Sequence, residues 1–314
     1  METKLKKQIV DAARKYCGEN RLGQDEIATI AGISPGYINS MFKGKETHKA
    51  GKDNEAIISD KTYRKLAQAI KFPLEKEYWE TIETSQYLSI KATLITAKAN
   101  GRTAMIIGST GCGKTYTVNN FCIDYPVNTF RLTMSCLYTL QDVLNELCEK
   151  LKITTKGNKL HKMNRVIERL RNIKLEGGKP IIIFDEAENM GIALLKMLKG
   201  LYDGIKNYCS IVLIGTNQLT DKLNKLKTRD KDGIPQFCRR FKAGKVELKE
   251  VQKKEMAGFF ENFGIADKNF IDLLLSMAEN YGELNDYLEP AFKEADRLEQ
   301  PLDIDLFRMI YDLK

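Results

Sequence analysis

The run at residues 108–115 has the residue types that bind phosphate. Its sequence, GSTGCGKT, matches the pattern G-x-x-x-x-G-K-T and stands directly between an apolar strand-like run, AMIIG, and a helix-forming stretch. The glycines let backbone N–H groups curl around a phosphate at a helix N-terminus, Lys114 offsets its charge, and the Thr115 hydroxyl can ligate Mg²⁺. The sequence therefore predicts an ATP and Mg²⁺ site with contacts from Gly108, Ser109, Thr110, Gly111, Cys112, Gly113, Lys114, Thr115 and Tyr116.

A pair of carboxylates follows the apolar run IIIF at residues 181–184. Asp185 and Glu186 come at the end of that run, whose apolar residues predict a strand buried on both faces. Parallel sheets bind ligands at the carboxyl ends of their strands, so this pair should lie beside the phosphate loop. We expect Asp185 to hold the magnesium shell and Glu186 to orient and deprotonate the attacking water.

Two further groups could complete a hydrolytic site. The run IVLIG at residues 211–215 predicts a strand that delivers Asn217 to the same edge, where an amide can place the water. Arg239 and Arg240 stand before the last expected strand, and an arginine given to a neighbouring subunit's γ-phosphate would make hydrolysis depend on assembly. The alternatives are a turn role for Asn217 and a DNA-facing or solvated arginine pair.

Alternating strand and helix patterns would hold these residues in place. Apolar runs predict strands at residues 103–108, 128–135, 180–185, 210–215 and 245–248, and helical periodicity predicts helices at 114–124, 140–151, 161–174 and 192–206. This alternation indicates the α/β class, a parallel sheet with helices on both faces. Four helical pieces follow. We predict an N-terminal domain with its linker at 1–80, an α/β core at 81–249 and a helical lid at 250–314.

The N-terminal domain should be an all-α helix-turn-helix domain. A short helix that breaks at Gly32 and a second helix that opens at Ser34 have the required spacing. Ser34 can cap the second helix and Pro35 suits its first position, while Ile33 and Ile38 should pack inward. The second helix could then enter a DNA major groove with its outer side chains, Tyr37, Asn39, Ser40 and Lys43. An ordinary helical hairpin is the alternative.

A polar connection and one more helix should complete this domain. Residues 48–61 are mostly polar, and the pattern from residue 63 to 71 predicts a helix. Phe72 and Pro73 should end that helix, because a proline disfavours helical backbone in the residue before it.

Charge is distributed unevenly along the chain. The net charge is +8, but residues 150–179 carry 10 basic against 2 acidic side chains, residues 222–254 carry 12 against 4, and residues 255–314 carry 5 against 14. The two basic segments indicate a polyanionic partner such as double-stranded DNA, unless they are only solvated helix faces. In the first segment a flexible loop beside Gly157 would contact DNA through Lys156, Lys159 and Lys162.

Composition excludes several classes of protein. No run reaches the length of about 18 apolar residues that a membrane span needs, and the first 20 residues lack the apolar stretch of a signal peptide. We therefore expect a cytoplasmic protein. The 7 cysteines are odd in number and never two residues apart, and only 2 histidines accompany them, so we expect reduced thiols and no cysteine-bound metal.

The order of these motifs resembles that of the AAA+ ATPases. GSTGCGKT, IIIFDEAEN, the strand LIGTN, the arginines of RRF and a helical lid follow one another over residues 85–314. With a helix-turn-helix domain in front, the chain is similar to the MuB-like phage transposition regulators, with TnsC- and IstB-like proteins as more distant relatives. The resemblance implies ATP-driven homo-oligomers, helical filaments or rings, on double-stranded DNA, which present target DNA to a DDE transposase and stimulate it.

Residue by residue, the resemblance gives Lys114 and Thr115 the Walker A roles, Asp185 and Glu186 the Walker B roles, and Asn217 the sensor role. Arg240 best fits the arginine finger, with Arg239 second. In the lid, Asn285 stands where many relatives have an arginine, and an amide cannot supply that charge.

Two other functions remain open at this point. One is a helicase loader, a related machine. The other is a transcription regulator whose helix-turn-helix reads an operator while ATP switches it. The regulator should prefer one palindrome, whereas a filament former should cover any duplex in proportion to its length.

Overall fold

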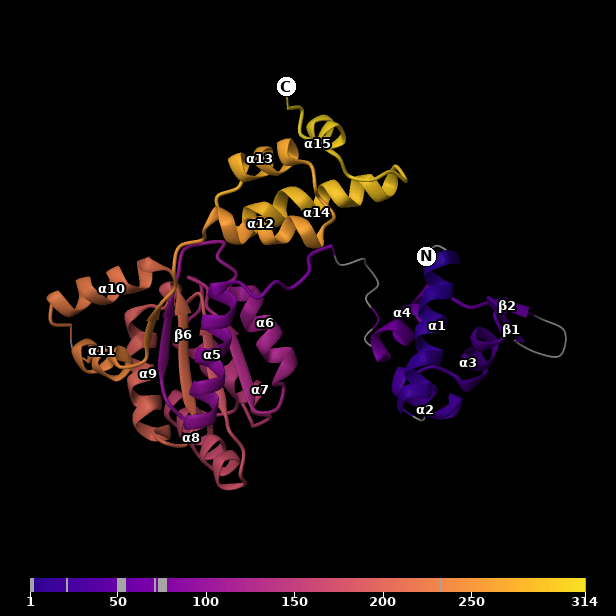
Figure 1. Ribbon diagram of the computed structural model, residues 1–314. Coiled ribbons are helices and arrows are strands. Elements are labelled where there is room, and N and C mark those ends of the chain that lie inside the picture. The colour runs from indigo at the N-terminus through magenta and orange to yellow at the C-terminus, as the bar shows by residue number, and fades with distance from the viewer. Residues whose placement is uncertain are drawn as a thin grey trace. The chain divides into compact units, whose positions relative to one another are not determined.

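The computed structural model describes residues 3–20, 22–49, 55–70, 72, 78–231 and 233–313 (Figure 1). The chain divides into two compact units, Met1–Trp79 and Glu80–Lys314. Pro73, which we expected to end a helix of the first unit, and residues 50–54 of the polar connection lie outside the described residues.

The first unit packs its helices around one apolar core. Gly32 adopts a left-handed backbone, φ +61°, which ends one helix and turns the chain into the next. Ile27, Ile38 and Leu66 are fully buried where these helices meet. The elements in chain order are α1 (Thr3–Asn20), α2 (Gln24–Ala31), α3 (Pro35–Phe42), β1 (Thr47–Lys49), β2 (Glu55–Ile57) and α4 (Asp60–Ala69).

This unit differs from the predicted all-α domain in two details. β1 and β2 form an antiparallel pair, with Thr47 opposite Ile57, in the stretch that we expected to be only a polar connection. Ser34 is the N-cap residue of α3, as predicted, but its side chain makes no capping hydrogen bond. α2 ends at Gly32 and α3 opens after Ser34, as the sequence predicted, and a helix-turn-helix role for the pair stays a prediction.

The second unit is built on a parallel five-stranded sheet. Its strand order is β4-β5-β6-β3-β7, and the register aligns the carboxyl ends of the three central strands. β5 and β6 are buried along their whole length, as expected for strands covered on both faces. The strands are β3 (Ala104–Ile107), β4 (Thr129–Thr133), β5 (Ile181–Asp185), β6 (Ser210–Gly215) and β7 (Lys245–Glu247).

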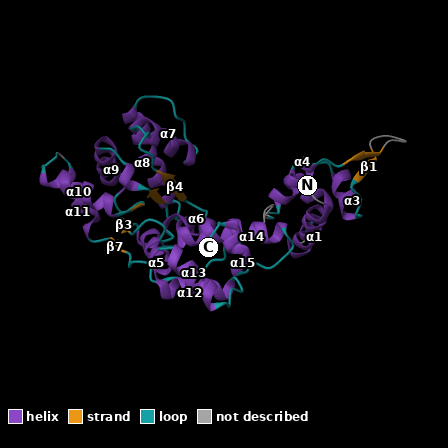
Figure 2. Ribbon diagram, turned by 90° about the horizontal axis from the view of Figure 1, so that it is seen from above, coloured by secondary structure: helices purple, strands orange, loops and turns teal. Residues whose placement is uncertain are grey.

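Helices cover both faces of this sheet, as predicted (Figures 1 and 2). One apolar cluster joins α5 and α6 to the sheet through residues such as Leu94 and Phe121, and a larger cluster joins the remaining core helices through residues such as Leu170 and Leu198. The core helices are α5 (Ser85–Asn100), α6 (Lys114–Asp124), α7 (Leu140–Lys150), α8 (Lys159–Leu175), the 3₁₀ turn η1 (Ala187–Asn189), α9 (Ile192–Ile205), α10 (Asn217–Thr228) and α11 (Ile234–Lys242).

The chain after residue 250 forms the predicted helical lid. Figure 1 shows these helices gathered beyond the carboxyl ends of the strands, on the side of the phosphate loop. Phe260, Phe270 and Phe307 are buried within them. The helices are α12 (Lys253–Asn262), α13 (Lys268–Met277), α14 (Tyr281–Arg297) and α15 (Ile304–Ile310).

Candidate active site

The phosphate loop connects the buried strand β3 to the first turn of α6. Gly111 and Gly113 have φ values of +73° and +86°, a backbone that side chains disfavour, so both positions need glycine. The Lys114 Nζ lies back over the loop and donates hydrogen bonds to the carbonyl oxygens of Gly108, at 2.9 Å, and Ser109, at 2.6 Å. An ammonium group is thereby held inside the ring of backbone that would surround a phosphate.

The other predicted residues of the loop differ in their exposure and contacts. Thr110 is exposed and Cys112 is buried. Tyr116, on the first turn of α6, shares a hydrogen bond of 2.5 Å between its hydroxyl and that of Thr81. Residues just before α5 therefore contact the helix that begins at the phosphate loop, and the predicted contact residue Tyr116 lies where the two segments meet.

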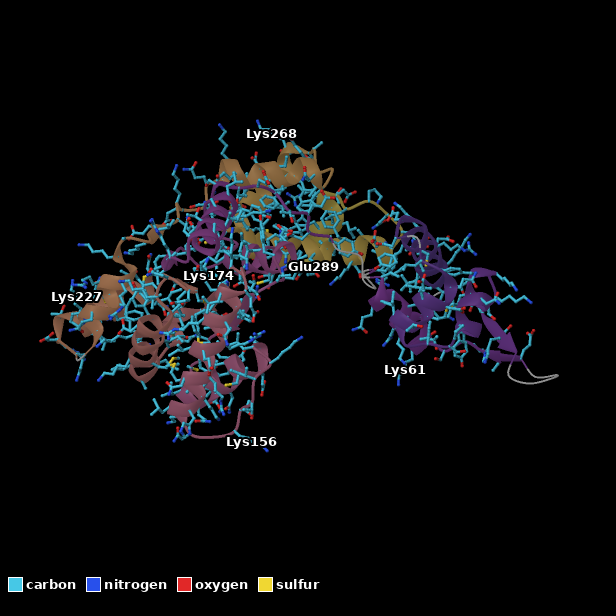
Figure 3. The ribbon with its side chains drawn as sticks, turned by 90° about the horizontal axis from the view of Figure 1, so that it is seen from below. Lys61, Lys156, Lys174, Lys227, Lys268 and Glu289 are labelled. Atoms are coloured by element: carbon cyan, nitrogen blue, oxygen red, sulfur yellow. The ribbon has the colours of Figure 1, made fainter. Side chains whose placement is uncertain are left out.

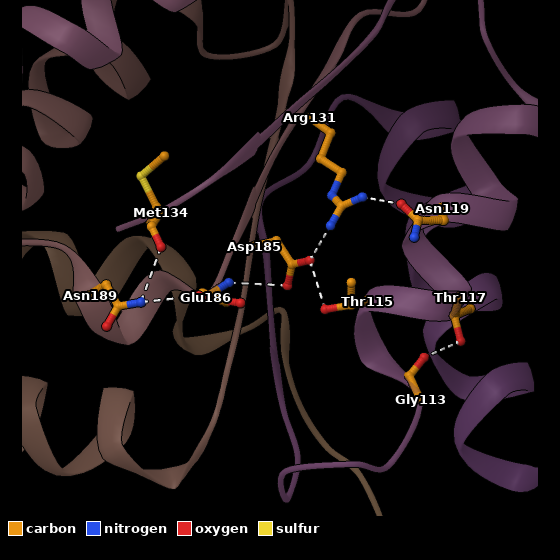
Figure 4. Close-up of polar contacts among 9 residues, drawn as sticks. All are labelled: Gly113, Thr115, Thr117, Asn119, Arg131, Met134, Asp185, Glu186 and Asn189. Carbon is orange, nitrogen blue, oxygen red and sulfur yellow. Dashed lines mark hydrogen bonds and ion pairs between the residues drawn. The ribbon is translucent and has the colours of Figure 1, made fainter. Parts of the chain in front are cut away.

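A hydroxyl and a carboxylate meet beside the loop (Figure 4). The Thr115 Oγ1 donates to the Asp185 Oδ2 at 3.0 Å, although the two residues lie 70 positions apart. Asp185 is 1% exposed. Hydroxyl and carboxylate oxygens are the hard donors that Mg²⁺ prefers, together with phosphate oxygens and water, so this pair fits a magnesium ion bridged to a phosphate.

Glu186 stands one residue beyond this pair in a left-handed backbone, φ +53°. Its N–H donates to the Asp185 Oδ1 at 3.0 Å, and its carboxylate is exposed. The Asn189 Nδ2 donates to the Glu186 Oε2 at 3.2 Å and to the Met134 carbonyl at 3.0 Å (Figure 4). A non-glycine residue in this conformation is uncommon and is held by its surroundings, here by the turn η1 that carries Asn189.

Sequence reasoning missed two residues of this site. Asn189 contacts Glu186, and a polar side chain three residues after the carboxylate was the available signal. Arg131 donates from Nη2 to the Asp185 Oδ2 at 2.8 Å and from Nη1 to the Asn119 side chain. Its signal was a single charge inside the strand TFRLT. Asp185 thus faces a guanidinium and a hydroxyl on the same oxygen.

Asn217 is the first residue of α10 and is exposed near the end of β6. The neighbouring Thr216 has a buried hydroxyl for which the described part of the chain offers no hydrogen-bond partner. The Glu188 Oε2 is buried in the same way, and a Cβ added at Gly215 would lie 2.5 Å from it. The sensor role of Asn217 stays a prediction.

The lid contacts the phosphate loop through neutral groups. The Gly282 N–H donates to the Gly111 carbonyl at 3.1 Å, and a Cβ at Gly111 would collide with the Asn280 side chain. The single proton of the Tyr281 hydroxyl is shared between two acceptors, the Gln86 Oε1 of α5 at 3.0 Å and the Glu255 Oε2 of α12 at 3.2 Å. Burial and the Glu255 charge raise the pKa of Tyr281 well above its usual range, so this hydroxyl keeps its proton.

Asn285, where many relatives have an arginine, makes its hydrogen bond within its own helix. Its Nδ2 donates to Glu289 on the next turn of α14, at 3.4 Å. Its carbonyl oxygen is buried without a hydrogen-bond partner in the described residues. The contacts between lid and loop therefore come from the start of α14, not from the position where an arginine was expected in relatives.

The two finger candidates lie in the last turn of α11. The Arg240 Nη2 donates to the Asp203 Oδ1 at 2.6 Å, and its guanidinium lies 5.1 Å from the ring centre of Tyr202. Arg239 is exposed, and the described residues give it no ion pair or hydrogen bond through its guanidinium. Within one subunit, Arg239 is the freer of the two, and Arg240 must leave Asp203 before it can reach a neighbour.

The three lysines proposed to contact DNA have different surroundings. Lys156 and Lys159 are exposed at the start of α8, and Figure 3 shows Lys156 at the periphery of its unit. Lys162 is 4% exposed, and its Nζ donates to the Asn145 Oδ1 at 2.5 Å. The prediction for Lys162 is therefore wrong, because helical periodicity puts it on the buried face of α8 with Val166.

In the first unit the predicted outer side chains of α3 also differ. Asn39 and Lys43 are exposed. Tyr37 is half-buried, with its ring 4.3 Å from that of His48, so it is less free than expected, and its contact with DNA stays a prediction. β1, which carries His48, packs against the helix and covers this side chain.

Residues 98–223, which hold the phosphate loop and the carboxylate pair, match the family described as "AAA domain". This chain carries an AAA domain. An AAA domain with this loop and these carboxylates makes the chain an ATPase, and the parallel sheet with its helical lid is the AAA+ fold. The solved structure of the Aeropyrum pernix ORC2 protein (ADPNP-ADP complexes) has a similar fold, with a TM-score of 0.54, 16% identity, and coverage of 73% of this chain and 67% of that one.

Two curated relatives are similar over most of their length. The chain is 24% identical over 289 residues to the Mu-like prophage FluMu DNA transposition protein B of Haemophilus influenzae, which covers 88% of this chain and 92% of that protein. It is 22% identical over 312 residues to the ATP-dependent target DNA activator B of Escherichia phage Mu, with coverage of 91% and 92%.

The described residues contain no helix long and apolar enough to cross a membrane. The same part of the chain has no cluster of three or more His, Cys, Asp or Glu side chains placed to hold a metal ion. A metal at the phosphate loop would therefore need oxygens from the nucleotide and from water.

Proposed function

We propose that this chain is a Mg²⁺-dependent ATPase that assembles on double-stranded DNA, without marked sequence preference, and activates it as the target of a DDE transposase. The observation that carries the proposal is the meeting of Thr115 and Asp185 at the phosphate loop, with Glu186 one residue beyond. The similarity to proteins named as DNA transposition and target DNA activator proteins supports the choice of pathway.

In this proposal each residue at the loop has one chemical role. Lys114 turns from the loop carbonyls to the β- and γ-phosphates, and loop N–H groups hold the same oxygens. Thr115 and Asp185 hold Mg²⁺, which when bound offsets phosphate charge. Glu186, oriented by Asn189, accepts a proton from the attacking water. Asn217 helps to place that water.

A neighbouring subunit completes the site in this proposal. Both finger candidates lie in the last turn of α11, which lies apart from the loop of its own subunit (Figure 1). The resemblance makes Arg240 the first candidate, and Arg239, which is exposed and not held by Asp203, is the second. Subunits with Arg240→Ala should be inactive alone. Mixing them with Lys114→Ala subunits, which keep Arg240, should restore part of the ATPase rate. No rescue in proven mixed oligomers would contradict a role in trans for Arg240, and the same mixture with Arg239→Ala tests the second candidate.

DNA binding is assigned mainly to the exposed lysines of the ATPase unit. Lys156 and Lys159 stand at a loop and helix start with no acidic partner recorded among the described residues. Contacts of this kind reach phosphates, so affinity should fall steeply with salt and depend little on sequence. Asn39 and Lys43 of α3 should add affinity.

The experiment measures binding of the full chain to a fluorescent duplex of random sequence, with and without ATP. Lys156→Glu with Lys159→Glu should weaken ATP-dependent binding at least about tenfold, since each lost phosphate contact removes a released counterion. Lys225→Glu with Lys227→Glu, the same change of charge on exposed positions of α10, is the matched comparison. Electron microscopy of the same samples should show protein on DNA in proportion to duplex length.

Two outcomes would replace the proposal. If Asn39→Ala with Lys43→Glu removes all binding while the α8 changes do nothing, the helix-turn-helix is the reader, and one preferred palindrome should then identify a transcription regulator. If discrete rings form on single-stranded DNA and none on duplex, a helicase loader fits better.

A further inference from the structure

The edge strand β4 has one side that no other strand covers. β4 pairs only with β5, in parallel register. The Ile181 N–H donates to the Asn128 carbonyl at 2.9 Å, and the Met134 N–H donates to the Asp185 carbonyl at 2.8 Å. Alternate residues of a parallel strand bond to the same neighbour, so the backbone N–H and C=O groups that point away from β5 belong to Thr129, Arg131 and Thr133. Within the described residues these groups have no recorded hydrogen-bond partner on that side.

A groove of about 730 Å³ runs along this edge. Its floor is β4 itself, one wall comes from the end of α6, and the other comes from α7, α8 and the loops beside them. Figure 2 shows β4 beside α7 and α8. We call this hollow the edge groove. Its charged lining residues are Arg131, Glu146, Lys150, Lys152 and Arg169, and Thr129, Thr133 and Tyr138 add hydroxyl groups.

The charge of the edge groove favours an acidic occupant. Four of its lining side chains are cations and only Glu146 is an acid, which leaves +3 among the lining residues, and one of these cations, Arg131, is paired with Asp185 outside the lining. Lys150 pairs with Glu146 at 3.4 Å, while Lys152 is exposed. Arg169 has Glu176 at 3.8 Å, outside the groove lining. Carboxylates entering the groove would meet more positive charge than its own acids neutralise.

The surroundings of the groove favour a peptide over a nucleic acid. Ile123 and Val127, next to lining residues at one end, are 73% and 72% exposed, and Leu137, at the other end, is 84% exposed. Apolar side chains at both ends gain nothing from contact with charged phosphates, whereas they can pack against apolar side chains of a bound peptide. Unpaired strand groups are the usual template for an added strand.

We propose that the edge groove binds an extended, acidic segment of a partner protein, which adds a strand to β4 and places its carboxylates among the groove cations. The backbone of Thr129, Arg131 and Thr133 provides the hydrogen bonds, and the groove walls select acidic over basic segments. Because DNA contacts are assigned to Lys156 and Lys159, a protein partner and DNA can be held by different surfaces of one subunit.

Arg131 connects this surface to the active site. It lines the groove, and its guanidinium also donates to the Asp185 Oδ2 at 2.8 Å, the oxygen that receives the Thr115 hydroxyl. The Arg131 Nε is buried without a partner in the described residues. A peptide carboxylate near Arg131 would compete with Asp185 for the guanidinium, so occupancy should change the ATPase rate. This second effect rests on the proposed role of Asp185, whereas docking does not.

The test uses the full chain and a fluorescent ten-residue peptide of alternating glutamate and valine. We expect it to bind with a Kd on the order of 10–100 μM, while a lysine–valine peptide of equal length binds at least about tenfold more weakly. Lys150→Glu with Arg169→Glu should reverse this preference, and Lys225→Glu with Lys227→Glu on α10 should keep it. Equal binding of the two peptides, or equal effects of the two double variants, would overturn the proposal.

A backbone variant separates strand addition from simple charge attraction. Thr129→Pro removes an N–H that faces the groove, and proline is tolerated on the open side of an edge strand. Thr129→Val loses the hydroxyl, which donates to the Tyr125 carbonyl and accepts from Lys98, but keeps the N–H. We expect binding to fall about tenfold in the proline variant relative to the valine variant. Equal affinity would overturn strand addition.

Two more measurements distinguish a peptide partner from DNA, and docking alone from an effect on the ATPase rate. If an unlabelled 30-base-pair duplex displaces the peptide and binds the groove variants more weakly, the groove is a DNA contact and the proposal is wrong. Phosphate release measured with saturating acidic peptide should differ from the basal rate at least twofold. If the peptide binds but the ATPase rate is unchanged, only the proposed link through Arg131 is overturned, and docking stands. If the chain binds the peptide but hydrolyses no ATP, the result counts against the proposed function and not against docking.

Discussion

Glu186→Gln tests whether the carboxylate after β5 performs the proton transfer. The change keeps the size of the side chain, and the new amide oxygen can still accept the hydrogen bond that Asn189 now donates at 3.2 Å. Glu186 makes no recorded side-chain contact with residues 108–115. Nucleotide affinity should therefore change less than about threefold, because only an interaction of the chemical step is lost.

The expected loss of turnover follows from the role. Removing a general base costs about 10²–10⁴-fold in rate, which corresponds to about 3–5.5 kcal/mol of transition-state stabilisation. Phosphate release under saturating ATP and Mg²⁺ measures the rate, and titration with a fluorescent nucleotide measures the affinity. Turnover within threefold of the wild type would remove Glu186 from this role, and an equal loss of affinity and turnover would make it a binding residue.

Asn189→Ala separates orientation from chemistry at the same site. A hydrogen bond to a charged group contributes about 1.5–3 kcal/mol, and the exposed position of Glu186 favours the lower end. The rate should then fall roughly tenfold, less than in Glu186→Gln. Asn224→Ala, an exposed asparagine of α10, is the control. If Asn189→Ala has full activity, Glu186 is oriented by other groups.

Three further substitutions test the loop and the buried lysine. Lys114→Ala should raise the nucleotide Kd on the order of 100-fold or more, because a charge that faces phosphate is lost, and the same titration measures it. Gly111→Ala should push Asn280 of the lid away and strain a φ of +73°, with a lower Tm and weaker nucleotide binding; wild-type values for both would contradict the observed contact. Lys162→Met should leave the free energy of unfolding within about 1 kcal/mol of wild type, since it conserves volume at a buried site, and should leave DNA affinity unchanged. Loss of DNA binding with an intact fold would return Lys162 to the interface.

Much of the fold was readable from the sequence, because its signals are local. The helix at 114–124 and the strand at 210–215 have the predicted bounds in α6 and β6, since a run of apolar residues or a helical repeat lies within one stretch of chain. The phosphate loop is equally local, and its match needs only neighbouring residues. The pairing of Asp185 with Thr115 was also expected, from the rule that parallel strands end at one edge.

Other features depended on contacts between distant segments. Lys162 belongs to a basic segment, but the packing of α8 on α7 buried it against Asn145, which charge counting along the chain cannot reveal. The partners of Arg131 lie on α6 and β5, so its role depends on the order of strands in the sheet. The sequence by itself determined which residues could bind phosphate and metal, because their types and spacing lie within short stretches. Only the tertiary structure decided which charges face water, which face Asp185 and which edge of the sheet stays open, because burial and strand order are set by the whole chain.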